Sequence, residues 1–211
     1  MYKIFLLVIV TTIIFSCSKS DDTTPPPTSS KGLMPLSVGN IWMYKKSNFD
    51  STGNLINTTG DTIQILSQVY VNGVAYYQQY QTSVSNINGG SFFVNVDSNT
   101  IDKIDSATRY IFFKKVSTNN VLVDTWADTV QTHCEGHNDL YGYTGTTNIN
   151  GHDCLKNVVL VTDCTGLTFE KWVYYLQPSV GLVRIEHYVL DNKGAFYLQF
   201  SDDLEKYSIS S

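Results

Sequence analysis

The chain alternates between short runs of β-forming residues and short polar breaks along most of its length. Runs rich in Val, Ile, Thr, Tyr and Phe are separated by Gly, Asn and Asp, and no window of helical length carries an apolar stripe with a 3.6-residue period. The run Ile41 to Phe49 leads into Asp50-Ser51-Thr52-Gly53, whose first Asp and fourth Gly favour a type I turn. Asn72-Gly73 lies between Ile63–Tyr70 and Val74–Tyr80 and predicts a hairpin, because both central residues of a type I′ turn need positive φ.

Turn residues recur along the rest of the chain, at Asn88-Gly89-Gly90, Asp97-Ser98-Asn99, Asn150-Gly151, Pro178 to Gly181 and Asp191 to Gly194. Such closely spaced hairpins predict an all-β fold: an antiparallel meander whose sheet is strongly curved into a half-barrel or barrel. The alternative is a two-layer β-sandwich. Crossover connections would fit within Thr118 to Asn120 or Cys134 to Tyr141.

The N-terminal segment is a largely apolar run, unlike the alternating pattern along most of the chain. Lys3 precedes an apolar run from Ile4 to Phe15, which is shorter than the roughly 20 residues that span a bilayer. Ile14-Phe15-Ser16-Cys17 resembles the lipobox of bacterial lipoproteins, although Phe15 is bulkier than the usual residue at its position. The resemblance implies a signal peptide over residues 1–16 and a Cys17 that carries several acyl chains such as palmitate, enough for a stable membrane anchor. The alternatives are an uncleaved anchor or an ordinary signal with an incidental cysteine.

Residues 17–31 read as a flexible tether, because they include Asp21, Asp22 and a three-proline run but no large apolar side chain to bury. The order Cys17-Ser18-Lys19-Ser20-Asp21-Asp22 is similar to the segment that follows the lipidated cysteine in surface-exported lipoproteins of the Bacteroidota. This resemblance implies the outer membrane and its cell-surface face, with the periplasmic face as the alternative. Residues 32–211 contain no second linker and are expected to form a single all-β domain.

Two further segments resemble lipid-anchored, secreted domains of the same bacteria. One is Pro35-Leu36-Ser37-Val38-Gly39-Asn40-Ile41-Trp42-Met43-Tyr44, and the other is Trp172-Val173-Tyr174-Tyr175-Leu176 followed by Val180-Gly181-Leu182-Val183. Proteins of this kind have no assigned chemistry. The resemblance therefore implies a location and a β-rich fold, and no site.

Charge and motifs narrow the functional classes. The formal net charge is −5 and no Lys/Arg cluster is present, so we expect no nucleic-acid partner. The sequence lacks a Gly-x-Ser-x-Gly elbow, a His-Glu-x-x-His pair and nucleotide-binding glycine loops, so we expect neither an enzyme nor a cofactor, with a hydrolase as the low-ranked alternative. His187 shares the strand alternation of Val183, Ile185 and Val189, which predicts a hydrogen-bonded core histidine.

Cysteine and histidine gather between residues 133 and 164. In an oxidising compartment, two of Cys134, Cys154 and Cys164 are expected to form a disulfide, and all three pairings stay open. Three unpaired thiols are one alternative. A metal site is another, with ligands from the irregularly spaced set Cys134, His137, His152, Cys154 and Cys164.

Aromatic residues offer the best functional candidates, since the chain has 14 Tyr, 10 Phe and 3 Trp. Such side chains on a sheet can stack on sugar rings or line an apolar pocket, and the candidates are Trp126, Tyr141, Tyr143, Tyr174 and Tyr175. Adjacent strand residues point to opposite faces, so only one of Tyr174 and Tyr175 can face a given pocket. Cross-strand packing is the competing role for all five.

Together these features predict a lipid-anchored cell-envelope protein that acts as a non-enzymatic binding or structural module. The alternative is a carbohydrate- or lipid-binding component of a nutrient-uptake system. The expected partners are the membrane, through the anchor, and a glycan or small apolar ligand.

Overall fold

A computed structural model describes residues 32–82, 91–96, 99–105, 108–115, 121–127, 137–163 and 165–210. Within these ranges the chain forms twelve strands: β1 (Ile41–Phe49), β2 (Leu55–Val71), β3 (Val74–Gln81), β4 (Phe92–Asn95), β5 (Thr100–Asp105), β6 (Thr108–Lys114), β7 (Val121–Ala127), β8 (His137–Ile149), β9 (His152–Thr162), β10 (Thr168–Gln177), β11 (Gly181–Leu190) and β12 (Phe196–Ser208). None of the described residues forms a helix that could cross a bilayer.

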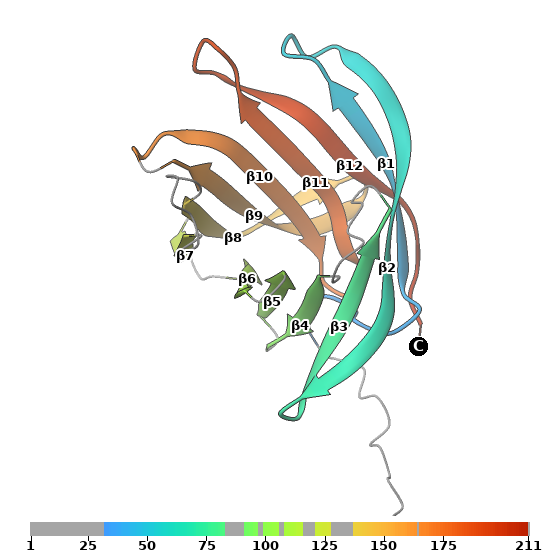
Figure 1. Cartoon of the computed structure of the whole chain (residues 1–211). Coiled ribbons are helices and arrows are strands. Elements are labelled where there is room, and N and C mark those ends of the chain that lie inside the picture. The colour runs from blue at the N-terminus through green and yellow to red at the C-terminus, as the bar shows by residue number, and fades with distance from the viewer. Residues whose placement is uncertain are drawn as a thin grey trace, which may run out of the picture.

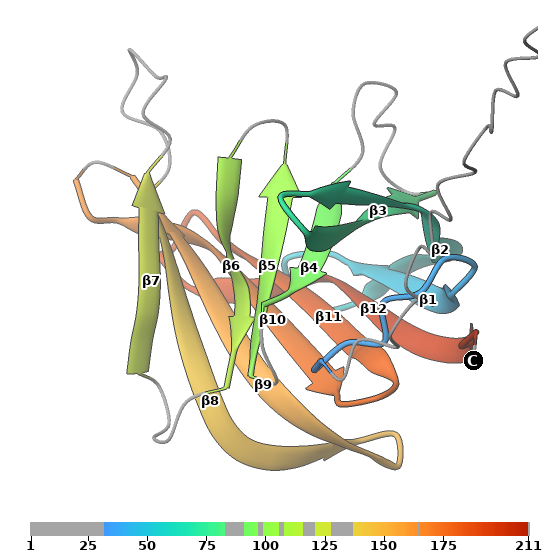
Figure 2. The same cartoon turned by 90° about the horizontal axis from the view of Figure 1, so that it is seen from below.

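All twelve strands belong to one antiparallel sheet that curls into a half-barrel (Figures 1 and 2). Their order is β6-β5-β4-β3-β2-β1-β12-β11-β10-β9-β8-β7, so the first and last strands pair in the middle of the sheet. The expected all-β, strongly curved meander is confirmed, and the sandwich alternative is wrong because one sheet forms both walls. Among the described strands, only β6 and β7 follow each other without pairing; β7 and β8 pair directly, which leaves no crossover between Cys134 and Tyr141.

The predicted hairpin at Asn72-Gly73 is confirmed. Val71 pairs with Val74, and Asn72 and Gly73 have φ of 52° and 78°. Asn150 and Gly151 join β8 to β9 in the same way, with φ of 53° and 88°. Both turns need positive φ at two successive positions, which Asn-Gly adopts at low steric cost.

Three turns at the upper end of Figure 1 each begin with an aspartate whose side chain accepts hydrogen bonds from the turn backbone. Oδ1 of Asp50 accepts hydrogen bonds from the backbone N–H groups of the second and fourth residues that follow, both at 2.9 Å. Asp163 and Asp191 repeat the pattern between β9 and β10 and between β11 and β12. Hydrogen bonds within each turn lower the pKa of these three carboxyl groups, so this end of the half-barrel carries fixed negative charge.

The main apolar core lies inside the curve of the sheet. Trp42 and Tyr44 on β1 and Ile63 and Ile65 on β2 are fully buried there, and the segment Leu33–Leu36 packs against the same core. The alternation of buried and exposed positions along β1, with Met43 and Lys45 exposed, is that of a strand with one face on a core.

Two buried hydrogen bonds join the segments that carried the family resemblance. Trp42 Nε1 donates to the carbonyl oxygen of Val180 at 2.6 Å, and Tyr44 Oη donates to that of Leu182 at 2.9 Å. The aromatic residues of the first segment therefore serve the fold, because they fix the start of β1 to the turn between β10 and β11.

A second, smaller cluster lies on the outer face of the sheet and contains Cys154, Val173, Tyr175, Val180 and Val183. The register of β11 shifts here: Leu182 pairs with Leu176 but Arg184 pairs with Tyr175, so Val183 is an extra residue. The expectation that Val183 shares the face of His187 is therefore wrong. Ile185 and His187 lie on the inner side, opposite Tyr174 and Trp172.

Candidate ligand-binding site

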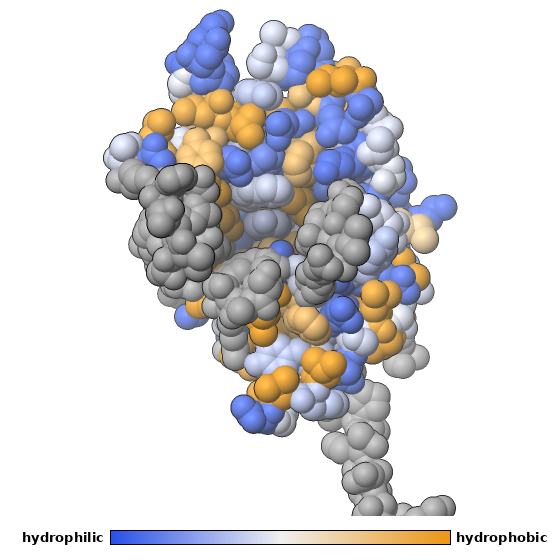
Figure 3. All heavy atoms as spheres, in the orientation of Figure 1, coloured by the Kyte–Doolittle hydropathy of each residue, from blue (hydrophilic) through white to orange (hydrophobic). Residues whose placement is uncertain are grey.

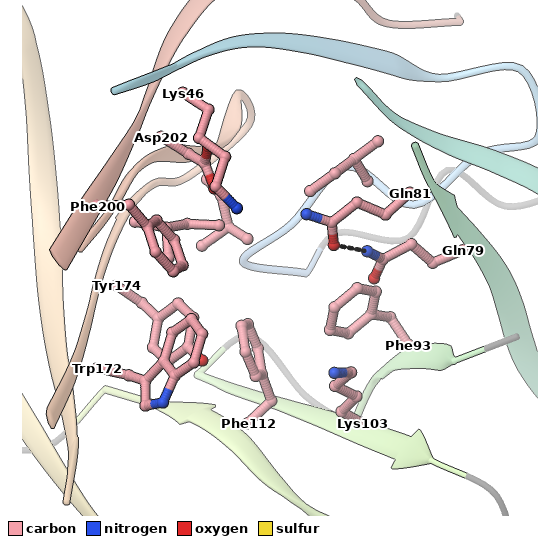
Figure 4. Close-up of a pocket in the computed structure, with 13 residues that line it drawn as sticks. Lys46, Gln79, Gln81, Phe93, Lys103, Phe112, Trp172, Tyr174, Phe200 and Asp202 are labelled. Carbon is pink, nitrogen blue, oxygen red and sulfur yellow. Dashed lines mark hydrogen bonds between the residues drawn. The ribbon is translucent and has the colours of Figure 1, made fainter. Parts of the chain in front are cut away.

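The concave face of the half-barrel encloses a cavity of about 390 Å³. The face is visibly hollowed at its centre in Figure 3, and Figure 4 shows the cavity from close by. Its lining comes from nine strands in both halves of the sheet and consists of Lys46, Ile63, Gln79, Gln81, Phe93, Lys103, Phe112, Trp172, Tyr174, Leu182, Ile185, Phe200 and Asp202.

One side of the cavity, the aromatic wall, consists of Phe93, Phe112, Trp172, Tyr174 and Phe200 (Figure 4). The rings contact one another in sequence around the cavity, with centroid distances of 5.1 Å for Phe93–Phe112, 4.8 Å for Phe112–Tyr174, 6.3 Å for Trp172–Tyr174 and 5.6 Å for Trp172–Phe200. The contact between Phe112 on β6 and Tyr174 on β10 joins strands from opposite halves of the sheet.

His187 and Glu170 hold the Trp172 side chain in position. Its ring stacks on His187 at 4.0 Å, and its Nε1 donates to Glu170 Oε2 at 3.3 Å. His187 Nε2 lies 3.2 Å from the same carboxylate oxygen, and the imidazole is buried. The prediction of a hydrogen-bonded core histidine is confirmed. The contacts of His187 orient the tryptophan ring toward the cavity.

The other side, the polar wall, consists of Lys46, Gln79, Gln81 and Asp202, whereas Lys103 lies among the rings, beside its cross-strand partner Phe93 (Figure 4). Gln81 Nε2 donates to Asp61 Oδ2 at 2.6 Å, and Gln79 Nε2 donates to Gln81 Oε1 at 3.5 Å (Figure 4). Two acceptor atoms of this wall, Gln79 Oε1 and Asp202 Oδ1, are buried and have no hydrogen-bond partner within the described part of the chain. A buried acceptor without a donor costs about 1–3 kcal/mol, so both atoms favour a ligand that donates to them.

Asp202 is the buried carboxyl group of this wall. Burial raises its pKa to about 6, and nearby Asp61 and Asp203 act in the same direction, whereas Lys46, its cross-strand neighbour on β1, opposes the shift. Above this pKa the side chain is a carboxylate that accepts hydrogen bonds. Below it, one oxygen carries a proton.

The structure separates the two predicted tyrosines of β10. Tyr174 lies in the aromatic wall, whereas Tyr175 lies on the outer face, where its hydroxyl donates to Glu186 Oε2 at 3.1 Å. Trp126 lies in β7, and Tyr141 and Tyr143 lie in β8, but their side chains are outside the described residues. Their roles stay predictions.

Sequence reasoning found only Tyr174 in the aromatic wall and missed Phe93, Phe112, Phe200 and Trp172. Trp172 is the residue that it could have found. It stands two positions before Tyr174 and therefore shares its face, so strand alternation could have identified it. The polar residues of the cavity could not be predicted in this way, because Lys and Gln in a strand usually indicate a face that is exposed to water.

The cysteine and histidine predictions fall largely outside the described residues, which include neither Cys17, Cys134 nor Cys164. Cys154 is buried, its thiol donates to the carbonyl oxygen of His152 at 3.4 Å, and burial raises its pKa to about 11. It forms no disulfide with any residue that the structure describes, so the expected pairing stays a prediction.

The metal site also stays untested. His152 Nδ1 lies 2.5 Å from Gln177 Oε1, and the side chain of His137 is outside the described residues. Across the described ranges, no three His, Cys, Asp or Glu side chains are grouped so that they could hold a metal ion.

Five chains of solved structures match this chain, and two of them are named below. No family model and no curated protein matches the chain. A structure from Bacteroides fragilis, described as a putative exported protein with a YmcC-like fold, is 14% identical, with a TM-score of 0.44 over 84% of this chain and 99% of that one. A structure from Parabacteroides distasonis, described as a putative lipoprotein, is 19% identical, with a TM-score of 0.40 over 85% of this chain and 99% of that one.

Proposed function

We propose that this chain is a lipid-anchored cell-envelope protein whose half-barrel binds a small carbohydrate. The observation that carries the proposal is the composition of the cavity, an aromatic wall facing buried acceptors that lack donors. A sugar ring presents both complementary surfaces, since its C–H groups pack on aromatic rings while its hydroxyl groups donate hydrogen bonds.

The positions of the groups support this ligand class. Trp172 and Tyr174 stack nearly parallel, with an interplanar angle of 8°, and offer flat surface to a ring. Gln79 on β3 and Asp202 on β12 approach the cavity from different strands, so the two acceptors would fix the orientation of a hydroxylated ring. The volume lies near the lower end of the range of about 300–1,000 Å³ for small-molecule sites, which favours one or two sugar units over a longer chain.

A fatty-acid anion is the second candidate. Lys46 and Lys103 both line the cavity, and either could pair with a carboxylate while the aromatic wall contacts the hydrocarbon. The Lys46 ammonium already lies 3.9 Å from the centre of the Phe200 ring, and Asp202 beside it would repel a bound anion. The carbohydrate is therefore the better match.

Binding should depend on Asp202 and on its ionisation. In a fluorescence titration of residues 18–211 against a panel of mono- and disaccharides, we expect saturable binding at pH 7.5, weakened about tenfold or more by Asp202→Asn. At pH 5 the parent should also bind more weakly, because protonation removes an acceptor lone pair of a group with a pKa of about 6.

Asp203→Asn is the matched control, since Asp203 is the next residue along β12 but bonds to Arg184 instead of lining the cavity. It should bind as the parent does, provided that its melting curve shows a folded protein. If the protein binds dodecanoate but none of the sugars, the ligand is a fatty-acid anion and the carbohydrate proposal is refuted. Binding of neither class would refute the cavity as a ligand-binding site.

The anchor is proposed from the sequence, with Cys17 as the lipidated residue and the outer face of the outer membrane as the location. The lipobox-like Ile14-Phe15-Ser16-Cys17 and the following Lys-plus-acidic segment support it. We expect Cys17→Ser to move the protein from the membrane to the soluble fraction, and protease added to intact cells to digest the parent. Unchanged membrane fractionation of the variant would refute the anchor, and full protection of the parent would refute surface exposure.

A further inference from the structure

The hairpin of β2 and β3 projects beyond its neighbours at one end of the half-barrel (Figure 1). β1 pairs with β2 only as far as Gln64, although β2 continues to Val71. Residues 66–71 are thus paired on one side only, with β3. Every residue from Val69 to Val74 is exposed, whereas Gln68 is half-buried and its partner Tyr77 belongs to the main core.

The projecting part is unusually apolar for a solvent-exposed hairpin. Its tip exposes five large apolar side chains by 41% to 55%, namely Leu66, Val69, Tyr70, Val71 and Val74. Val69, Tyr70 and Val71 are consecutive, a pattern that a soluble surface normally avoids. Orange apolar side chains gather at this lower end in Figure 3.

The projecting part of the hairpin also carries no charge. From Thr62 to Val96 the sequence contains no Asp, Glu, Lys or Arg, and the exposed Tyr70 lies between the exposed Val69 and Val71. Uncharged, Tyr-bearing apolar surface is suited to the interface of a bilayer, where aromatic rings sit at headgroup level. The opposite end of the half-barrel, with its three ionised aspartate turns, is not.

The chain that leads to Cys17 leaves the described domain beside this hairpin. Met34 is held to β4 by Asn95, whose Nδ2 donates to the Met34 carbonyl oxygen at 2.8 Å. Two residues before Asn95, Phe93 pairs with Tyr77 of β3, so Asn95 lies level with Ala75, next to the exposed Val74. Only fourteen residues lie between Cys17 and Gly32, a reach of at most about 50 Å.

We propose that the tip of this hairpin, residues 66–74, docks on the lipid bilayer and is a second membrane contact beside the acyl anchor. The contact is apolar and interfacial: valine side chains enter the boundary between headgroups and acyl chains while Tyr70 stays at the level of the headgroups. Docking turns the acidic end of the half-barrel away from the membrane.

Vesicle binding tests the contact without the anchor. Residues 18–211, which lack the acylated cysteine and keep every described strand, are sedimented with sucrose-loaded vesicles of phosphatidylcholine. We expect measurable binding that added salt does not weaken, and a loss of about tenfold or more in Val69→Ser/Val71→Ser/Val74→Ser. Leu55→Ser/Ile56→Ser is the matched control, because these exposed residues lie at the other end of the same strand; it should bind as the parent does.

Melting curves confirm that each variant is folded. The proposal is overturned if the parent does not sediment with vesicles, if the control variant loses binding equally, or if the hairpin variant binds like the parent. It is also overturned if the parent is a dimer that only the hairpin variant dissociates, since the tip would then contact a second copy of the chain. A Cys17 without lipid would leave these outcomes unchanged, so the anchor and the hairpin contact can fail separately.

Discussion

Replacing Trp42 with alanine is expected to lower the free energy of unfolding by about 3–5 kcal/mol, the range for removing a large aromatic side chain from a core. Trp42 is 0% exposed, and its indole N–H donates to the carbonyl oxygen of Val180 at 2.6 Å. Alanine would leave a void in the core and remove a buried donor at the same position. Urea denaturation measures the effect as a lower midpoint at an unchanged slope.

Two further substitutions make this result interpretable. Trp42→Phe keeps most of the ring but loses the N–H, so it should cost about 1–2 kcal/mol. Tyr207→Ala removes the cross-strand partner of Trp42 on β12, which is 48% exposed, and should cost less than about 1 kcal/mol. A Trp42→Ala protein as stable as the Tyr207→Ala protein would contradict this account of the core.

The second large effect is expected at Gly181, the first residue of β11. Its φ is +109°, and an added Cβ would lie 2.8 Å from Trp42 Nε1 and 3.1 Å from its Cε2. The indole cannot move away without breaking its hydrogen bond to Val180. We therefore expect Gly181→Ala to destabilise the protein by about 3 kcal/mol, from backbone strain and overpacking of about 1–3 kcal/mol each.

Gly194→Ala separates the cost of backbone strain from the cost of overpacking against Trp42. Gly194 also has positive φ, at +81°, but nothing lies within 4 Å of the position of its Cβ, so only the backbone effect of about 1 kcal/mol should remain. In a Trp42→Phe background the penalty at Gly181 should shrink, because the clashing part of the indole is gone. Equal costs at Gly181 and Gly194, measured by the same urea titration, would argue against the steric contact with Trp42.

Local structure was the part of this fold that the sequence predicted best. β1 spans the expected Ile41 to Phe49, and the Asn72-Gly73 and Asp50-to-Gly53 turns form where expected, because their residues decide the backbone angles locally. β2 is longer than expected: it begins at Leu55 and passes through Gly60. Pairing with β1 sustains a strand there that the polar residues alone did not predict.

The candidate site was less predictable, because it is assembled from nine strands that meet only when the sheet curls. Lys46 and Gln79 look in sequence like residues turned to water, and their inward orientation follows from the register of each strand. The shift at Val183 shows how one extra residue reverses such an assignment. Trp172 was accessible to sequence reasoning, since it alternates with the predicted Tyr174.

The pairing of β1 with β12 determines when the centre of the sheet can fold. The central ladder of the sheet joins Ile41 to Ser208, so it cannot form until the chain has been made as far as β12. Contacts this distant in sequence form slowly, since a long loop must close before they contribute. The growing chain therefore lacks its central strand pair throughout synthesis, and β12 completes the sheet by pairing with β1 and β11.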